Sequence, residues 1–270
     1  MDVLENALVR EFDYPAYQQR QHLETTKKQL VERARKLRKA DHFALEGGQW
    51  KSLPYVGYAV VSMVDNNPGN ESVGNRLREM QSRLAKGFRR PSAFFPLPPD
   101  SFHQTVANTL SNERFRQHIA DKGLAADYPA LLGKAFGEFP AAIHSGPIRL
   151  RLGGLSLFSS AVGVLGTFEE EGDFQRVLDF REHVYSNAGL NGLGIQRTRP
   201  FVGHVTLAYL EEELTRQEKA VLINTCVAIN HELKNQALHF LLSRTELRRY
   251  QDLAGFHTEP GYPSYSFVKA

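Results

Sequence analysis

Two short strings in the chain resemble each other and carry residue types suited to acid–base chemistry. They are His103-Gln104-Thr105-Val106-Ala107 and His204-Val205-Thr206-Leu207-Ala208. Because a β-strand sends residues i and i+2 to the same face, each string would offer one imidazole and one hydroxyl side by side. Two such pairs facing each other would supply two acid–base groups and two hydrogen-bond donors, a set that suits phosphoester chemistry.

Chance alone does not readily produce this pairing. The chain has 10 His and 11 Thr among 270 residues, and random placement at this composition would give roughly 0.4 His-x-Thr pairs. An alternative stays open, in which both strings are plain strands with satisfied His–Thr hydrogen bonds and no catalysis. The remaining histidines have no Thr at i+2 and are interpreted as scattered surface or core residues: His22, His42, His118, His144, His183, His231, His239 and His257.

The strings occupy corresponding places in two halves of the chain, and their histidines are 101 residues apart. Each half is predicted to run strand, helix, His-x-Thr strand, helix, strand. The predicted ranges are 55–64, 71–86, 102–108, 112–121, 128–138 and 148–158 in the first half, then 161–168, 173–188, 202–210, 214–233 and 239–248 in the second. Such a duplication commonly gives two lobes around a central cleft, where ligands bind.

The flanks of this repeat differ from it in composition. Residues 15–39 are predicted to form a helix opened by Pro15 and rich in Lys and Arg, whose basic face is better explained as a solvated surface than as an RNA or phospholipid contact. Its expected apolar positions are Leu23, Leu30, Ala34 and Leu37. The Pro-rich segment 91–99 is expected to be neither regular helix nor central strand, and 189–194 to be a loop. The predicted division is an N-terminal helical extension (1–50), a bilobal domain (51–253, with halves 51–158 and 159–253) and a C-terminal tail (254–270).

Composition narrows the class of protein. The net charge of +3 and pI near 8.9 are compatible with an anionic substrate but fall short of a dedicated nucleic-acid-binding surface. Residues 1–10 lack a signal-peptide core, and no window is apolar enough for a membrane span, so a cytoplasmic protein without a membrane partner is expected. A single cysteine, Cys226, excludes an intrachain disulfide. The absence of a Walker A sequence and of a Lys-x-Asp-Gly motif argues against ATP hydrolysis and self-adenylating ligation.

With its two His-x-Thr motifs in strand context, the chain resembles the 2H phosphoesterase superfamily over about residues 53–250. Members of that superfamily include RNA 2′,3′-cyclic phosphodiesterases. The resemblance implies an α+β fold, duplicated and two-lobed, with antiparallel sheets around a central cleft. It also implies that His103 and His204 act as general acid and base, and that Thr105 and Thr206 hold the phosphate.

The expected activity is hydrolysis of a 2′,3′-cyclic phosphate, on a nucleotide or an RNA end, or of a related small phosphoester. No metal or other cofactor is expected, because a cyclic phosphate is a strained diester and neither motif carries an adjacent carboxylate. No obligate protein partner is evident. Two alternatives remain: a non-catalytic module that binds nucleotides or RNA ends in the same cleft, and a structural protein in which the strings are coincidental.

Several residues are weaker candidates. Arg197 and Arg199 precede the second motif and would bring a guanidinium within reach of a phosphate, although surface solvation explains either equally well. The tail aromatics Tyr262, Tyr265 and Phe267 would either stack on a base or, as we favour, pack on the core. Strict alternation along the second strand places Val205, Leu207 and Tyr209 on the face opposite His204 and Thr206.

Overall fold

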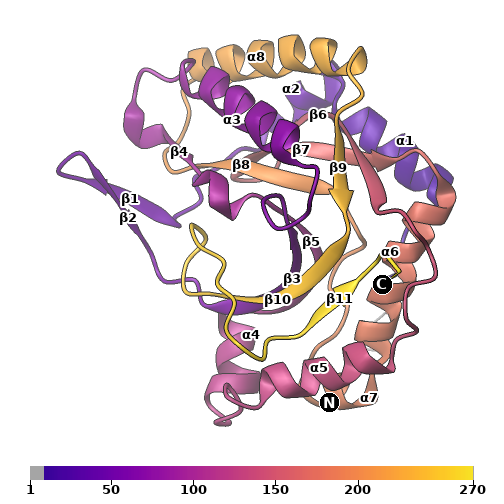
Figure 1. The fold of residues 1–270 in the computed structure, drawn as a ribbon. Helices are drawn as coiled ribbons and strands as arrows, with labels where there is room; N and C mark the ends of the chain where they lie inside the picture. The colour runs from indigo at the N-terminus through magenta and orange to yellow at the C-terminus, as the bar shows by residue number, and fades with distance from the viewer. Residues whose placement is uncertain (1–8, 270) are drawn as a thin grey trace, which may run out of the picture.

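The computed structural model describes residues 9–269 and shows a mixed α+β fold (Figure 1). Its strands pair in antiparallel fashion throughout, in a nine-stranded sheet of order β11-β10-β3-β5-β8-β7-β6-β9, with β4 attached to β8 and a separate β1-β2 hairpin. The predicted α+β class with antiparallel strands is therefore confirmed. The domain boundaries, and the division into two duplicated lobes, stay predictions.

The strands are β1 (Phe43–Glu46), β2 (Gln49–Ser52), β3 (Gly57–Met63), β4 (Phe94–Pro96), β5 (His103–Ser111), β6 (Ile148–Leu157), β7 (Ala161–Phe168), β8 (His204–Leu210), β9 (His239–Leu242), β10 (Arg244–Tyr250) and β11 (Ser264–Ser266). The helices are α1 (Tyr14–Glu24), α2 (Lys27–Arg35), α3 (Glu71–Ala85), α4 (Glu113–Phe115), α5 (Tyr128–Glu138), α6 (Glu171–Ser186), α7 (Ala188–Gly192) and α8 (Arg216–Lys234). Short 3₁₀ turns occupy Pro91–Ala93 and Pro99–Ser101, and a π-helical turn occupies Arg116–Ala120. No helix within residues 9–269 has the length and apolar character needed to cross a membrane.

The sheet bends so far that its two ends are joined by the chain itself. β9 pairs with β6 at one end, β10 pairs with β3 near the other, and only Ser243 separates β9 from β10. Figure 1 shows this run as one continuous curve. β3 is buried along its whole length, as expected of a central strand, and lies directly beside β5. The curvature brings distant parts of the chain around the β5–β8 junction.

The N-terminal extension differs from the single helix predicted over 15–39. It forms α1 and α2, separated at Thr25 and Thr26, and then the β1-β2 hairpin. The break follows from local chemistry, because the Thr26 hydroxyl accepts a hydrogen bond from Gln29 N and caps α2. Leu30 and Ala34 are buried as expected, whereas Leu23 is 51% exposed. Residues 1–8, which also belong to the predicted extension, lie outside the described part.

The extension is built into the sheet rather than appended to it. Tyr17, fully buried in α1, donates its hydroxyl to Gly166 O in β7 at 2.6 Å. The buried Gln21 side chain donates to Gly166 O and also to Gly203 O, the residue before the second motif. A Cβ at Gly203 would meet the Tyr17 hydroxyl at 2.6 Å, so the close approach of helix and strand requires glycine there. The extension therefore fixes the backbone that leads into His204.

The Pro-rich segment 91–99 is neither regular helix nor central strand, as predicted: it contains a 3₁₀ turn and the three-residue strand β4, which pairs only with β8 among the described residues and buries Phe94 and Phe95 there. One other predicted segment needs correction. The predicted loop 189–194 begins within α7, whose first turn is capped by the Asn187 side chain.

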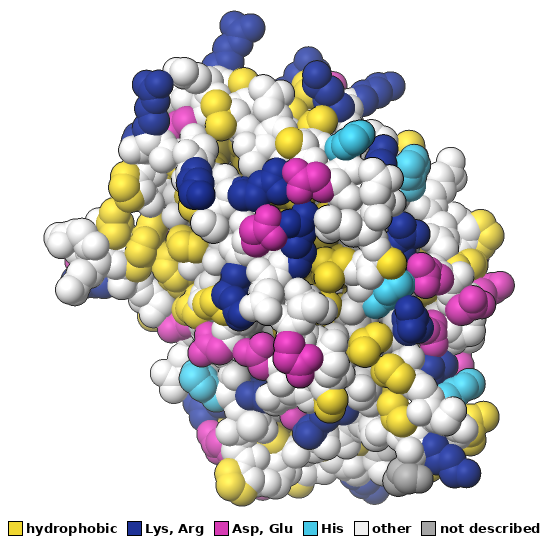
Figure 2. Space-filling model, turned by 45° about the horizontal axis from the view of Figure 1, so that its top comes forward, with side chains coloured by type: hydrophobic (Ala, Val, Ile, Leu, Met, Phe, Trp, Pro, Cys, Tyr) yellow, Lys and Arg dark blue, Asp and Glu magenta, His cyan; other side chains and the backbone are white. Residues whose placement is uncertain are grey.

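The outer face formed by α3 and α8 is a surface of paired charges. Arg76 and Arg83 of α3 both contact Glu232 of α8, with nitrogen–oxygen distances of 2.9 and 2.7 Å. Figure 2 looks toward the side that α8 occupies in Figure 1 and shows basic and acidic side chains interspersed. Such a mixed, exposed surface indicates solvation rather than a binding site of one charge.

Candidate active site

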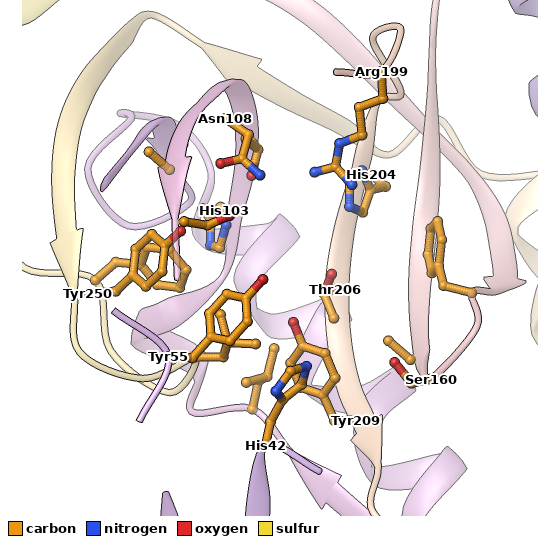
Figure 3. A pocket seen from close by; sticks show the side chains of 18 residues that line it. His42, Tyr55, His103, Asn108, Ser160, Arg199, His204, Thr206, Tyr209 and Tyr250 are labelled. Atoms are coloured by element: carbon orange, nitrogen blue, oxygen red, sulfur yellow. The ribbon is translucent and has the colours of Figure 1, made fainter. Parts of the chain in front are cut away.

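Both His-x-Thr pairs line one pocket of about 260 Å³ (Figure 3). His103 and Thr105 come from β5, while His204 and Thr206 come from β8. The two strands are antiparallel neighbours joined at the pair Gln104–Val205, the middle residue of each motif. The structure thus brings the four predicted residues together around a single space.

The fully buried Gln104 side chain bridges the strands where their backbones separate. Its Oε1 accepts a hydrogen bond from His204 N at 2.5 Å, and its Nε2 donates to Thr105 O at 2.7 Å. A buried amide in this position satisfies backbone groups that the sheet ladder leaves open. Gln104 therefore holds the second motif against the first, and it does so from the face away from the pocket.

Each imidazole is anchored in the same way. His103 Nδ1 lies 2.6 Å from Ser101 O, and His204 Nδ1 lies 2.8 Å from Val202 O, in both cases the carbonyl two residues earlier. A carbonyl oxygen only accepts, so Nδ1 carries the hydrogen and donates it. In the neutral ring this leaves the lone pair on Nε2, the nitrogen that is free to exchange a proton with a ligand.

The two rings are held in partly dry surroundings. Phe256 lies against His103, with ring centroids 4.1 Å apart, and Phe158 against His204, at 5.1 Å. Burial lowers the pKa of each imidazole to about 4; nearby Arg248 adds to this at His103, and Arg199 and the other imidazole add to it at His204. Without a bound anion, both rings are therefore neutral at pH 7.

A β-bulge on each strand adds one more residue to the pocket. The β3–β5 register passes from Ala107 to Thr105 and skips Val106, and the β7–β8 register passes from Ala208 to Thr206 and skips Leu207. One extra residue reverses the alternation of side chains beyond it. Asn108 and Tyr209 consequently line the pocket, each three residues after its threonine.

The prediction that Tyr209 faces away from His204 is therefore wrong. A sequence signal for the bulge existed in Gly163, the β7 partner of Thr206, because glycine inside a strand often marks a bulge or a close backbone approach. A Cβ at Gly163 would lie 2.8 Å from Val205 O.

The two candidate arginines are separated by the structure. Arg199 lines the pocket, and Figure 3 shows its guanidinium in the gap between Asn108 and His204. Arg197 is not brought there, because its guanidinium pairs with Glu182 and lies 3.5 Å from Glu11 Oε1. Arg197 ties the loop before β8 to the N-terminal segment and α6.

Several pocket residues were not anticipated. His42 and Tyr55 come from the segments around the β1-β2 hairpin, and the His42 ring lies 5.1 Å from both the Tyr55 and the Tyr209 ring. Burial lowers the pKa of His42. Tyr250 and Phe256 reach the pocket from β10 and the tail. No local pattern distinguishes these residues, because long-range packing alone brings them to the site.

The tail aromatics considered for base stacking do not line this pocket. Tyr265 stacks on Phe180 with ring centroids 5.0 Å apart, Phe267 is buried, and the Tyr262 hydroxyl lies 3.5 Å from that of Tyr58. They pack on the core, as favoured from the sequence. Among residues 9–269, no group of three His, Cys, Asp or Glu side chains is arranged to hold a metal ion.

Comparison with known proteins identifies the fold. No family model and no curated protein matches the chain. Among solved structures, it is similar to ATU0111, a conserved protein of unknown function from Agrobacterium tumefaciens str. C58, at 17% identity and a TM-score of 0.57, over 84% of this chain and 91% of that one. At this identity the similarity shows a shared fold and nothing further.

Two further solved structures are more loosely similar. They are TT0787 of Thermus thermophilus (20% identity, TM-score 0.45) and a crystal structure described as a phosphoesterase (15% identity, TM-score 0.40). Each covers 80% of this chain and 99% of the other.

Proposed function

We propose that this protein hydrolyses a phosphodiester, with a 2′,3′-cyclic phosphate on a nucleotide or RNA end as the substrate class, by metal-independent acid–base catalysis. One observation carries the proposal. Two imidazoles, each anchored through Nδ1, and two threonine hydroxyls from neighbouring strands line one pocket, and none of its described lining residues is Asp or Glu. Such a pocket favours an anionic group and disposes two proton-transfer groups around it. The resemblance of the motifs to those of 2H phosphoesterases points the same way.

The proposed reaction needs one proton taken and one given. One neutral imidazole removes a proton from water as the water oxygen attacks phosphorus. The other, protonated imidazole donates to the alkoxide oxygen as its bond to phosphorus breaks. Thr105 and Thr206 donate to the non-bridging oxygens, where negative charge accumulates, and Arg199 balances that charge. Binding of the anion between the rings raises the pKa of an imidazole and so restores the proton that burial disfavours.

We assign His204 as the base and His103 as the acid. Cations lower the pKa of both rings, Arg248 at His103 and Arg199 at His204, but only Arg199 lines the pocket. Its guanidinium lies beside His204 in Figure 3, where it favours the neutral ring required of a base. His103 lies across the pocket, on the β5 side.

The test is hydrolysis of uridine 2′,3′-cyclic phosphate by the purified protein in the presence of EDTA. We expect conversion to a single uridine monophosphate, and ³¹P NMR of the product reports whether the 2′- or the 3′-bond is cut. Turnover should fall strongly in His103→Asn and in His204→Asn. The matched control for both is His231→Asn, the same change at an exposed position in the last turn of α8. Activity that disappears with EDTA and returns with a divalent ion would refute the metal-independent mechanism.

A second candidate function is nucleotide or RNA-end binding without turnover. The low pKa of both imidazoles favours it, because the ligand-free pocket lacks a protonated acid at pH 7. Saturable binding of uridine 2′,3′-cyclic phosphate, with no product after prolonged incubation between pH 5 and 8, would select this function over hydrolysis.

A further inference from the structure

A second chamber, of about 300 Å³, adjoins the histidine pocket. The two share five lining residues, Thr105, Asn108, Phe158, Arg199 and His204, so they are neighbours, with one residue of each motif in the wall between them. The far side of the second chamber is built by the N-terminal segment, which contributes Phe12 and Arg20. The proposed hydrolysis uses Thr105, Arg199 and His204 in the shared wall and assigns no role to the rest of the second chamber.

Three arginines line the second chamber, and they differ in their partners. Arg181 is buried and satisfied, since it pairs with Glu11 at 2.9 Å and donates to the carbonyl oxygens of Val106 and Arg199. Arg20 and Arg199 have no carboxylate within 4.0 Å among residues 9–269. The Arg20 guanidinium donates only to the neutral Gln21 side chain in that part of the chain.

Among residues 9–269, Arg20 has no ion-paired carboxylate although its side chain is partly buried. Burial lowers the pKa of its guanidinium, and the more distant Glu24 only partly opposes this. None of the described residues lining either chamber is Asp or Glu. The aromatic side chains of Phe12, Phe158 and Phe201 restrict water around the arginines, which strengthens their attraction for an anion.

We propose that the second chamber binds a second phosphate of the substrate, with Arg20 and Arg199 as its ligands. The substrate is then a cyclic phosphate that carries a further phosphoryl group, rather than a bare nucleoside 2′,3′-cyclic phosphate. Guanidinium groups suit this role because they bind phosphate oxygens in bidentate fashion. The inference rests on the proposed function for which phosphate is cleaved, but the binding of a second anion is testable without turnover.

The first test compares three substrates: uridine 2′,3′-cyclic phosphate, its 5′-phosphorylated form, and the dinucleotide UpU ending in a 2′,3′-cyclic phosphate. We expect kcat/KM to be about tenfold higher for at least one of the two bisphosphorylated substrates than for the first. Preference for the 5′-phosphorylated mononucleotide identifies a terminal phosphate as the second group, and preference for the dinucleotide identifies an internucleotide phosphate. Equal kcat/KM for all three substrates would overturn the proposal.

The second test changes Arg20→Gln, which removes the charge and keeps most of the side chain. We expect the preference for the better substrate to fall about tenfold, while Arg20→Lys retains part of it. The matched control is Arg35→Gln in α2, an exposed arginine of the same extension that lines neither chamber. A preference unchanged in a folded Arg20→Gln variant, with the wild-type melting temperature, contradicts the proposal.

A binding measurement separates this inference from the proposed hydrolysis. By calorimetry, the wild-type protein should bind uridine 3′,5′-bisphosphate about tenfold more tightly than uridine 3′-monophosphate, and Arg20→Gln should abolish that difference. Absence of turnover together with this difference would refute the hydrolase and leave the second-phosphate site standing. Turnover without this difference in affinity would support the hydrolase and refute the second-phosphate site.

Discussion

The two walls of the histidine pocket, β5 and β8, are alike in backbone and unlike in side chains. Both strands show the same alternation of partly exposed and buried residues from the histidine onward, the same bulge after the threonine and the same anchoring of Nδ1. Beyond the bulge, β5 presents Asn108 and β8 presents Tyr209. Arg199 stands beside His204 only (Figure 3).

The shared features and the unlike features have different consequences: the first position the two imidazoles, and the second distinguish their proposed roles as acid and base. The shared features hold each imidazole and hydroxyl at a fixed orientation, as a site that transfers protons requires. Among the unlike features only Arg199 carries a charge, and in the proposed reaction it favours His204 as the ring that stays neutral during turnover. Substitutions at the shared features should therefore have the largest effects, and substitutions at the unlike features the smallest.

The largest effect is expected where the walls are equivalent. His103→Asn and His204→Asn should each lower kcat for uridine 2′,3′-cyclic phosphate by about 10²–10⁴-fold, because each removes one proton-transfer step. The measurement is steady-state kinetics with EDTA present, and His231→Asn should keep wild-type rates. Wild-type turnover by either pocket variant would rule out the two-histidine mechanism.

A substrate with a 4-nitrophenolate leaving group distinguishes the two histidines. This group departs without a proton, so loss of the general acid should matter little and loss of the base should matter fully. With such a diester, His103→Asn should recover most of its activity and His204→Asn should not. The opposite pattern would reverse our assignment of acid and base.

The next largest effect is expected in the pH dependence of kcat/KM. Since the pKa of each free imidazole is about 4, the singly protonated form needed for catalysis is scarce at neutral pH. We expect kcat/KM, which reports the free enzyme, to rise as the pH falls from 8 to 5.5, by up to about tenfold per unit. His103→Asn, lacking the acid, should lose this slope.

The same pKa shifts predict the direction of the pH dependence of folding. A histidine whose pKa is lower in the folded than in the unfolded state contributes stability above the unfolded value of about 6.5 and loses it as the pH falls through the folded value. Urea denaturation should therefore show a free energy of unfolding that decreases as the pH is lowered from about 6.5 toward 4, and the double Asn variant should show a weaker dependence on pH. A kcat/KM profile with its maximum at pH 8 would contradict the low pKa values.

A smaller effect is expected at the threonines. Thr105→Val and Thr206→Val keep the shape of the side chain and remove the donor, and each should lower kcat about tenfold. Thr→Ser at the same positions should retain most of the activity because the hydroxyl remains. If valine and serine variants behave alike, the hydroxyls do not bind the phosphate.

The smallest effects should appear at the positions beyond the bulges, where the walls differ. Tyr209→Phe and Asn108→Ala should each change kcat/KM only a few-fold, since neither side chain transfers a proton in the proposed reaction. We expect the two changes to differ in substrate dependence. Asn108 lies in the wall shared with the second chamber, so Asn108→Ala should lower kcat/KM more for a bisphosphorylated substrate than for uridine 2′,3′-cyclic phosphate. Tyr209 lines the histidine pocket only, so Tyr209→Phe should affect both substrates equally.

Much of the local structure follows from periodicity. The helix predicted over 128–138 is α5 and the strand predicted over 161–168 is β7, both with the expected bounds. The apolar residues of a helix or a strand repeat with a period that is visible within a short stretch of sequence, so the sequence pattern indicates the type of element. The helix predicted over 15–39 was wrong in its middle, because Thr26 competes for the backbone there through its own cap.

What lies around the pocket was harder to foresee. His42 appears in the sequence as one of several scattered histidines, and Arg20 as one of many cations on a basic helix. Both reach the site because the N-terminal segment folds back onto the sheet and its buried Tyr17 and Gln21 bind the backbone of β7 and of Gly203. Contacts of such long sequence separation leave no local periodic signature.

The sequence by itself determined the identity and pairing of the candidate acid–base and phosphate-binding groups, because a two-residue spacing on a strand places an imidazole and a hydroxyl on one face whatever the rest of the chain does. The tertiary structure alone decided that the two pairs share one pocket, that bulges add Asn108 and Tyr209 to it, and that Arg199 enters it while Arg197 does not. Register, bulges and ion pairs depend on which strands and helices meet, and that is fixed only when the whole core packs.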